Sequence, residues 1–263
     1  MTLAKLRSLA VLITGFLFVA ISVMIFVPIC ILLLPSRRLR IGACNVYGKI
    51  VGRFCQLIAG AHIPVSIAER ANQLHPAIYV SNHTSVFDVF IAIWTCPLFT
   101  AGVAKKEIVW VPFFGVLYLL SGHLLVNRSD RRQAVAALSS IARLTQRSRL
   151  GIWIWAEGTR SRDGRLLPLK KGFAHLALAT RLPIVPVVVS GAHKVWEKHT
   201  FTINPADNVT VQVLDPIATL DWREDTLDEH IARVHAAFAA ALPDDQKPQI
   251  GRASCRERVS SPV

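Results

Sequence analysis

The sequence predicts an α/β domain with a largely parallel sheet flanked by helices, preceded by an N-terminal hydrophobic membrane-anchor helix or helical hairpin. Three observations lead to this prediction. An uncharged apolar segment lies near the N-terminus. Short β-type runs alternate with helical stretches downstream of it. Hydrophobic residues make up 52% of the 263 residues and charged residues only 18%, which excludes a disordered chain.

The N-terminal segment has the length and composition of a membrane anchor. No charged side chain lies between Arg7 and Arg37, and residues 9–34 are nearly all apolar. As a helix, this segment would reach about 39 Å, beyond a hydrocarbon core of about 30 Å. Pro28 would kink or end the helix, so both a tilted span and a re-entrant hairpin are compatible with the sequence. A buried helix of a soluble protein is the alternative, which the length disfavours.

The distribution of charge predicts the location and partners of the chain. Lys5 and Arg7 precede the apolar segment, whereas Arg37, Arg38 and Arg40 follow it. Because positive charges favour the cytoplasmic side, we expect an inner-membrane protein whose downstream domain lies in the cytoplasm. The formal net charge of +13 indicates an anionic partner such as membrane lipids or a phosphorylated substrate. Nucleic acid is not expected, because the basic residues are spread out and the anchor ties the chain to a membrane.

Strand-like and helical segments follow one another from about residue 41. The expected strands, rich in β-branched or aromatic residues, cover residues 77–80, 122–126, 151–155, 184–189 and 209–214. The expected helices, with apolar residues at helical spacing, cover residues 86–95, 130–146, 172–180 and 224–242. We therefore divide the chain into an anchor (1–40), one α/β domain (41–249) and a tail (250–263).

The tail is predicted to be foreign to the domain. Residues 250–259 (IGRASCRERV) resemble the translation of a common sequencing-adaptor DNA, so we expect the natural sequence to differ after Gln249. A plain basic tail is the alternative. The five cysteines are scattered, with no C-x-x-C pair and no histidine cluster at zinc spacing. This pattern argues against a disulfide framework or a metal site and fits a reducing compartment.

The segment SNHTSVFD, residues 81–88, directly follows the expected strand 77–80. Ligands of open α/β sheets bind beyond the carboxyl ends of the strands. If His83 lies in the loop and Asp88 in the first turn of the next helix, the carboxylate reaches the imidazole. Such a pair is a general base with the partner that orients it. The alternative, a helix cap beside an incidental surface histidine, stays open on spacing alone.

The segment EGTRS, residues 157–161, follows the expected strand 151–155. Gly158 lets backbone approach a ligand closely, Thr159 offers a hydroxyl, and Arg160 offers a planar fork for phosphate. Glu157 would accept from a substrate hydroxyl or hold Arg160. A polar turn with a surface ion pair is the alternative.

Lys171 stands at the start of the expected helix 172–180. A cation is unfavourable at a helix N-terminus unless an anion also binds there. This misfit favours phosphate binding at Lys171, with a solvated lysine pair as the alternative.

Several common catalytic motifs are absent from the sequence. It contains no G-x-S-x-G, no G-x-x-x-x-G-K-[ST] and no G-x-G-x-x-G, the signs of a serine hydrolase, an NTPase and a dinucleotide enzyme. A base without a protein nucleophile fits direct transfer, in which the base activates a substrate hydroxyl that attacks an activated acyl group.

Four motifs in order resemble the 1-acylglycerol-3-phosphate acyltransferases, within the glycerophospholipid acyltransferase group. They are Asn82-His83-x₄-Asp88, Lys105-x-Glu107-Ile108-x₃-Pro112-x₂-Gly115, Glu157-Gly158-Thr159-Arg160-Ser161 and Val185-Pro186-Val187-x₂-Ser190-Gly191. Arg128 stands where the family usually carries an arginine. The resemblance covers about residues 41–214 and the N-terminal anchor, which makes residues 41–249 the expected acyltransferase domain.

The resemblance implies a specific reaction in phospholipid biosynthesis. A fatty acyl thioester on coenzyme A or acyl carrier protein would be the donor, and the sn-2 hydroxyl of lysophosphatidate the acceptor, with phosphatidate as product. His83 would act as the base and Asp88 would orient it, with no metal and no further cofactor. The expected substrate-binding residues are Lys105, Arg128, Arg160 and Lys171 for the phosphate, and Glu157, Gly158 and Thr159 for the glycerol site.

Two departures from the family pattern leave the acceptor open. Trp155-Ala156 replaces the usual Phe-Pro, and Ser85-Val86-Phe87 stands within the first block, where the family often has Trp or another aromatic residue. An acyltransferase for another lysophospholipid or an amino-acid lysolipid therefore stays an alternative. A non-catalytic basic protein that binds anionic lipid is a second alternative, and an esterase is a third that the missing nucleophilic serine disfavours.

Overall fold

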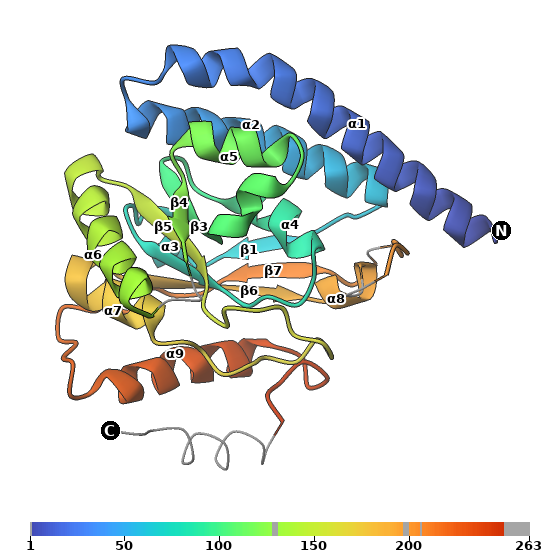
Figure 1. The fold of residues 1–263 in the computed structure, drawn as a ribbon. Coiled ribbons are helices and arrows are strands. Elements are labelled where there is room, and N and C mark those ends of the chain that lie inside the picture. The colour runs from blue at the N-terminus through green and yellow to red at the C-terminus, as the bar shows by residue number, and fades with distance from the viewer. Residues whose placement is uncertain (1, 128–130, 197–199, 206, 250–263) are drawn as a thin grey trace.

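The computed structural model describes residues 2–127, 131–196, 200–205 and 207–249, with side chains left out at residues 131–136. Arg128 and the tail 250–263, both named in the sequence predictions, lie outside the described residues. The described chain forms a seven-stranded mixed sheet between two layers of helices, with a long helix along one outer edge (Figure 1). The predicted α/β class with a largely parallel sheet is confirmed.

The strand order of the sheet is β1-β7-β6-β2-β5-β3-β4, and neighbouring strands in the described chain run parallel apart from β6 and β7. The strands are β1 (Val65–Ile67), β2 (Ile78–Ser81), β3 (Thr100–Lys105), β4 (Leu124–Val126), β5 (Gly151–Trp155), β6 (Ile184–Ser190) and β7 (Thr210–Val213). The central strand β2 pairs with β5 on one side and β6 on the other, so the carboxyl ends of these three strands meet at one edge.

Helices cover both faces of the sheet (Figure 1). They are α1 (Leu3–Leu32), α2 (Arg37–Ala59), α3 (Glu69–Asn72), α4 (Phe87–Thr95), the 3₁₀ helix η1 (Lys106–Trp110), α5 (Phe114–Ser121), α6 (Arg131–Ser148), α7 (Gly172–Thr180), α8 (Ala192–Val195) and α9 (Leu227–Ala241). Every residue of β6 is buried, because the strand packs into two separate apolar cores, one on each face of the sheet. This agrees with the weak alternation of its sequence.

Every predicted strand and helix is present, but several elements were missed. The structure adds β1, β3, α2, α3, α5, α8 and η1 to the prediction. Strand β3 reads TAGVAK, which is poor in β-branched and aromatic residues, and β1 has only three residues. The strand predicted from residue 122 begins at Leu124, because Gly122 has a φ of 81° and lies at the C-terminal cap of α5.

The apolar N-terminal segment forms α1, which runs through Pro28 without ending there. In the described part of the chain, α1 is the one helix long and apolar enough to cross a membrane. The chain then turns and α2 runs back beside α1, so the two helices form a hairpin (Figure 1). Arg7 Nη2 donates to the Ala59 carbonyl at 2.7 Å, and Cys30 packs against Cys44, so both ends of α1 contact the domain.

Glycines bring α2 unusually close to α4. A Cβ at Gly52 would lie 2.5 Å from the Phe90 carbonyl oxygen, and a Cβ at Gly48 would lie 3.1 Å from Ile93 Cβ. The two glycines are four residues apart and share one face of α2. Glycine is a poor helix former, which explains why the sequence pattern did not reveal α2. The predicted boundary at residue 40 falls within the first turn of this helix.

A cross-linking experiment tests the hairpin of α1 and α2. The Sγ atoms of Cys30 and Cys44 lie 3.8 Å apart and both side chains are buried. We expect a membrane-permeant oxidant to take two electrons and two protons from these thiols and join them. After denaturation and thiol blocking, trypsin cleaves at Arg37, Arg38 and Arg40, and the two cysteine peptides should stay linked until reduction. Mass spectrometry of the digest checks this, with Cys55→Ser as the control that keeps the cross-link. Separate peptides in the oxidised wild type would contradict the hairpin.

Candidate active site

The loop that follows β2 is fixed to β6 by the side chain of Asn82. Asn82 Oδ1 accepts from the Val189 N–H and Asn82 Nδ2 donates to the Val189 carbonyl, both at 2.8 Å. The side-chain amide thus pairs with the backbone of β6 as a further strand residue would, and it is buried. His83 therefore begins its loop from a rigid point at the carboxyl edge of the sheet.

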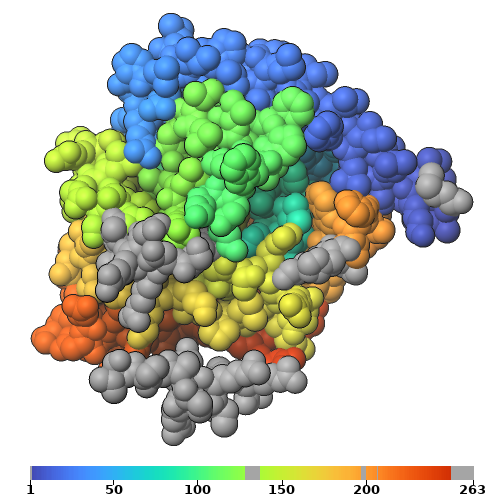
Figure 2. All heavy atoms as spheres, in the orientation of Figure 1, coloured from blue at the N-terminus to red at the C-terminus, as the bar shows by residue number. Residues whose placement is uncertain are grey.

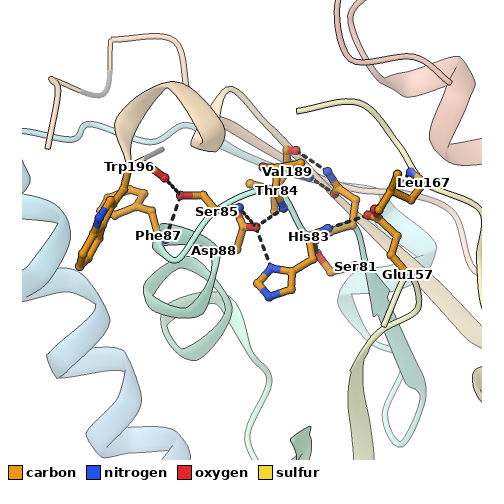
Figure 3. Close-up of polar contacts among 11 residues, drawn as sticks. Ser81, His83, Thr84, Ser85, Phe87, Asp88, Glu157, Leu167, Val189 and Trp196 are labelled. Carbon is orange, nitrogen blue, oxygen red and sulfur yellow. Dashed lines mark hydrogen bonds and ion pairs between the residues drawn. The ribbon is translucent and has the colours of Figure 1, made fainter. Parts of the chain in front are cut away.

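His83 and Asp88 form a hydrogen-bonded pair (Figure 3). His83 Nδ1 lies 2.9 Å from Asp88 Oδ2, and the Thr84 and Ser85 N–H groups donate to the same oxygen at 2.6 and 2.8 Å. His83 lies in the loop and Asp88 in the first turn of α4, which is the arrangement the spacing was predicted to allow. Because the carboxylate accepts, the Nδ1 atom carries the proton and Nε2 keeps a lone pair.

The His83 ring is held on one face by Trp155, the last residue of β5. The ring centroids lie 4.7 Å apart with 21° between the planes. The His83 side chain is 15% exposed, whereas that of Asp88 is 1% exposed. Within the described residues, His83 Nε2 makes no hydrogen bond. The arrangement is an oriented imidazole with one nitrogen left for a substrate proton.

Glu157 holds the backbone of His83. Its Oε1 accepts from the His83 N–H at 2.7 Å and its Oε2 accepts from the Leu167 N–H at 3.1 Å (Figure 3). The side chain is buried. Burial raises the pKa of Glu157 to about 8, against the effect of the two N–H donors and with a contribution from the charge of Asp88. The structure thus gives Glu157 a positioning contact, whereas its predicted contact with substrate stays a prediction.

The rest of the EGTRS segment wraps around His83. The Ser161 N–H donates to the His83 carbonyl at 2.8 Å, so Glu157 and Ser161 hold the two sides of one peptide segment. Gly158 has a φ of 72°, a conformation that favours glycine, and forms the turn between them. Thr159 is exposed and Arg160 is half-buried. The segment therefore contacts the His83 backbone through Glu157 and Ser161, and substrate binding by Gly158, Thr159 and Arg160 stays a prediction.

Two other predicted phosphate ligands lie elsewhere around the sheet. Lys105 is exposed at the carboxyl end of β3, the same edge as the loop of His83. Lys171 precedes α7, and its Nζ lies 2.7 Å from Asp228 Oδ1 of α9 in an exposed ion pair. The anion that balances this lysine in the structure is therefore a carboxylate, and phosphate binding at Lys171 stays a prediction. No structural account applies to Arg128, which lies outside the described residues.

The serine hydroxyls next to His83 are already engaged, and the Thr84 hydroxyl is buried without a hydrogen-bond partner among the described residues. Ser85 Oγ donates to the Trp196 carbonyl at 2.7 Å, and Ser81 Oγ donates to the Asn82 carbonyl at 3.1 Å. Among the described residues, no three or more His, Cys, Asp or Glu side chains lie together in a way that could hold a metal ion. The site therefore offers an oriented base, and the group it activates fits a bound hydroxyl better than a neighbouring serine.

Asn82 and Trp155 are the positioning residues that the sequence did not reveal. Asn82 was recognised only as part of a motif, and Trp155 only as a departure from the family pattern. A large aromatic residue at the carboxyl end of a strand, two residues before the acidic Glu157, is the signal that points to Trp155.

Comparison with known proteins links this geometry to one family. A family profile described as Acyltransferase matches residues 62–190. The 1-acyl-sn-glycerol-3-phosphate acyltransferase of Cocos nucifera is 40% identical over 90% of this chain and 76% of its own length, and that of Limnanthes douglasii is 42% identical over 89% and 82%. The enzyme of the same name from Escherichia coli is 32% identical over 76% of this chain and 80% of its length.

A solved structure has the same fold. The crystal structure of the 1-acyl-sn-glycerophosphate (LPA) acyltransferase from Thermotoga maritima matches with a TM-score of 0.70 and covers 88% of this chain and 94% of its own. At 20% sequence identity, this likeness concerns the fold.

The raised pKa of Glu157 predicts a pH dependence of stability. Between its ordinary pKa of 4.5 and about 8, the native state keeps a proton that the unfolded state has lost, so stability falls as pH rises through this range. Well inside this range, where the native state is protonated and the unfolded state is not, the free energy of unfolding falls by about 1.4 kcal/mol per pH unit. We expect Glu157→Gln to remove this contribution, as measured by urea unfolding in detergent across the range. The exposed Glu224→Gln is the matched control, and equal slopes for wild type and Glu157→Gln would contradict the shift.

Proposed function

The chain belongs to the 1-acyl-sn-glycerol-3-phosphate acyltransferase family, and from this premise we propose that it transfers a fatty acyl group to the sn-2 hydroxyl of lysophosphatidate, which makes phosphatidate. The observation that supports this best is the His83–Asp88 pair, whose Nε2 is available at the carboxyl edge of the sheet. The relatives named above carry this activity in their names, and the site supplies the base that the reaction needs.

The proposed mechanism is a direct transfer. His83 Nε2 takes the proton of the sn-2 hydroxyl while the oxygen attacks the thioester carbonyl carbon. Asp88 stabilises the imidazolium that forms and keeps Nδ1 protonated. The C–S bond then breaks as the tetrahedral intermediate collapses, and the imidazolium returns its proton to the departing thiolate. Every proton is accounted for by one histidine, so the step calls for neither a metal nor a further cofactor.

The acceptor is held beside the imidazole by cations at the same edge of the sheet. Arg160 follows Gly158 in the loop that holds His83, and its guanidinium offers a fork for phosphate. Lys105, at the end of β3, is a second ligand at this edge, and Thr159 donates or accepts at the glycerol part. Arg128 and Lys171 complete the proposed set, with Lys171 released from Asp228 when phosphate is present.

The donor is an acyl thioester on coenzyme A or acyl carrier protein. The chemistry at the thioester carbonyl is the same for either carrier, so the carrier has to be identified by assay. A second acceptor class is favoured by one observation, the stacking of Trp155 on the His83 ring, because this side chain narrows the space next to the base. Another lysolipid acceptor therefore stands as the second candidate.

The membrane supplies both the acceptor and the place of reaction. Exposed apolar side chains on α1, such as Leu17, Met24 and Ile25, continue onto Trp110 of η1 and Leu119 of α5. Figure 2 shows α1 and α5 side by side on the outer surface, and the rings of Phe16 and Phe113 lie 5.7 Å apart. We propose that this surface lies in the inner membrane from its cytoplasmic side, where the flanking arginines meet anionic lipid.

Removal of the base tests the proposed activity. We expect membranes that carry the wild type to convert labelled acyl donor and lysophosphatidate to labelled phosphatidate, and His83→Ala to lower the rate by at least about 10²–10⁴-fold. Both donor carriers and a panel of other lysolipids are assayed in parallel. Product of a different lysolipid would support the second candidate. Transfer that persists at the wild-type rate in His83→Ala would contradict the mechanism, and no transfer by the wild type would leave lipid binding without catalysis.

The variant Asp88→Asn tests the role of the carboxylate while the base, His83, is still present. The Asn carbonyl oxygen can still accept from the Thr84 and Ser85 N–H groups, so we expect the fold to be kept. The carboxylate charge that stabilises the imidazolium is lost, so kcat should fall by about 10²-fold or more while KM for the acceptor changes little. Steady-state kinetics checks this against the exposed Asp225→Asn. A raised KM with unchanged kcat would instead assign Asp88 to acceptor binding.

A further inference from the structure

A shallow, open surface cavity of about 520 Å³ lies far from the imidazole, between the turn that joins α1 to α2 and the C-terminal end of α6. Its lining includes Ser36, Ser148 and four arginines, which are Arg37, Arg38, Arg147 and Arg149. We call it the arginine cavity. None of the residues proposed for acyl transfer contributes to it.

In the part of the chain that the structure describes, no carboxylate balances the positive charge of the arginine cavity. No carboxylate lines it, and among the described residues none of its four arginines forms an ion pair with Asp or Glu. Four like charges around one space repel each other unless an anion joins them. Guanidinium groups match phosphate oxygens in geometry as well as in charge.

Two of the arginines are held in place by backbone carbonyls. Arg37 Nε donates to the Gly122 carbonyl at 2.7 Å, and Arg38 donates to the carbonyls of Ser148 and Arg149. The Arg38 guanidinium also lies 4.2 Å from the centre of the Phe99 ring. Each guanidinium has five N–H groups, so donors remain after these contacts. The fold therefore fixes two guanidinium groups in advance of any ligand.

The other two arginines are exposed at the end of α6. Arg147 lies in its last turn, and Arg149 follows with a φ of 48°, a position where glycine is usual. The positive end of the 23-residue helix α2 also faces this region, since Ser36 is its N-cap and lines the cavity. Fixed donors, free guanidinium groups and a helix N-terminus thus meet in one space.

The location of the cavity fits a lipid head group. Leu32 at the end of α1 and Leu34 in the turn are 80% and 48% exposed, directly before Ser36. An apolar helix that lies in lipid would place this turn at the level of the phosphates. Arg149 precedes β5, whose far end is Trp155 beside His83, so about 15–20 Å of extended chain separates the cavity from the base.

We propose that the arginine cavity binds the phosphate of an anionic membrane phospholipid. This inference rests on the proposed membrane location, but not on acyl transfer. The bound phosphate would be contacted by Arg147 and Arg149 from solvent-facing positions and by Arg37 and Arg38 from fixed ones. The acyl chains of the same lipid would lie against the exposed end of α1.

Vesicle binding by the full chain tests the proposal. The variant Arg147→Gln/Arg149→Gln removes two exposed guanidinium groups for which the structure shows no side-chain hydrogen bond or ion pair within the described residues. We expect its binding to vesicles of phosphatidylcholine with phosphatidylglycerol to weaken by about tenfold or more, with little change on pure phosphatidylcholine. The control Arg70→Gln/Arg233→Gln has the same change of charge on exposed positions that do not line the cavity. Equal loss in both variants would show attraction by net charge alone and overturn the site.

A second measurement distinguishes a lipid from free phosphate. In neutral detergent, short-chain phosphatidylglycerol should raise the thermal midpoint of the wild type in a saturable way and that of the cavity variant much less. If inorganic phosphate gives the same stabilisation at the same concentration, the ligand is free phosphate and the lipid assignment is wrong. Acyl transfer in neutral detergent, expected to be equal in wild type and cavity variant, shows that the variant is folded. Absence of transfer in both, with lipid binding intact, would reject the proposed function and leave this inference standing.

Discussion

The hydrogen bonds that fix the loop between β2 and α4 are the constraint on which the site depends. Asn82 ties this loop to β6, while Glu157 and Ser161, which follow β5, hold the N–H and the carbonyl of His83. Because β2 lies between β5 and β6, a single loop can be held by both neighbours at once. The strand order of the sheet therefore brings the N-H-x₄-D and E-G-T-R-S motifs, which are distant in sequence, together so that they hold the His83 imidazole rigidly.

The same site is mechanically connected to the N-terminal hairpin. Gly48 and Gly52 let α2 pack directly on α4, and the first turn of α4 contains Asp88. Helices packed so closely do not slide without steric conflict, because a carbonyl oxygen lies where a side chain would begin. The distance between the His83–Asp88 pair and the apolar surface of α1 is therefore set by the packing of α2 on α4. For a reaction on a membrane lipid, this distance decides whether the acceptor hydroxyl can reach His83 Nε2.

The sequence predicted the parts of the structure that depend on local pattern. Apolar strands such as β6, the long apolar N-terminal helix and the placement of His83 in a loop and Asp88 in a helical turn follow from periodicity and spacing. The missed parts depend on tertiary contacts. The glycines of α2 look unfavourable for a helix until α4 is placed against them, and Glu157 looks like a surface ligand until its two oxygens are seen on backbone N–H groups. No local pattern contains those partners.

The exposed apolar side chains of η1 and α5 widen the apolar surface of α1 to one side, so this surface distinguishes one rotation of the domain about the axis of α1 from the others. The domain is fixed to α1 at both ends, through Arg7 and through the contact of Cys30 with Cys44, so the two would turn together in the membrane. A phosphate bound in the arginine cavity would add a polar point of attachment at the turn that joins α1 to α2, at the edge of the sheet opposite to His83. Together with the apolar surface of α1, η1 and α5, this point would limit rotation of the domain about the axis of α1. The proposed lipid site would then help to hold the edge that carries His83 in one orientation toward the membrane.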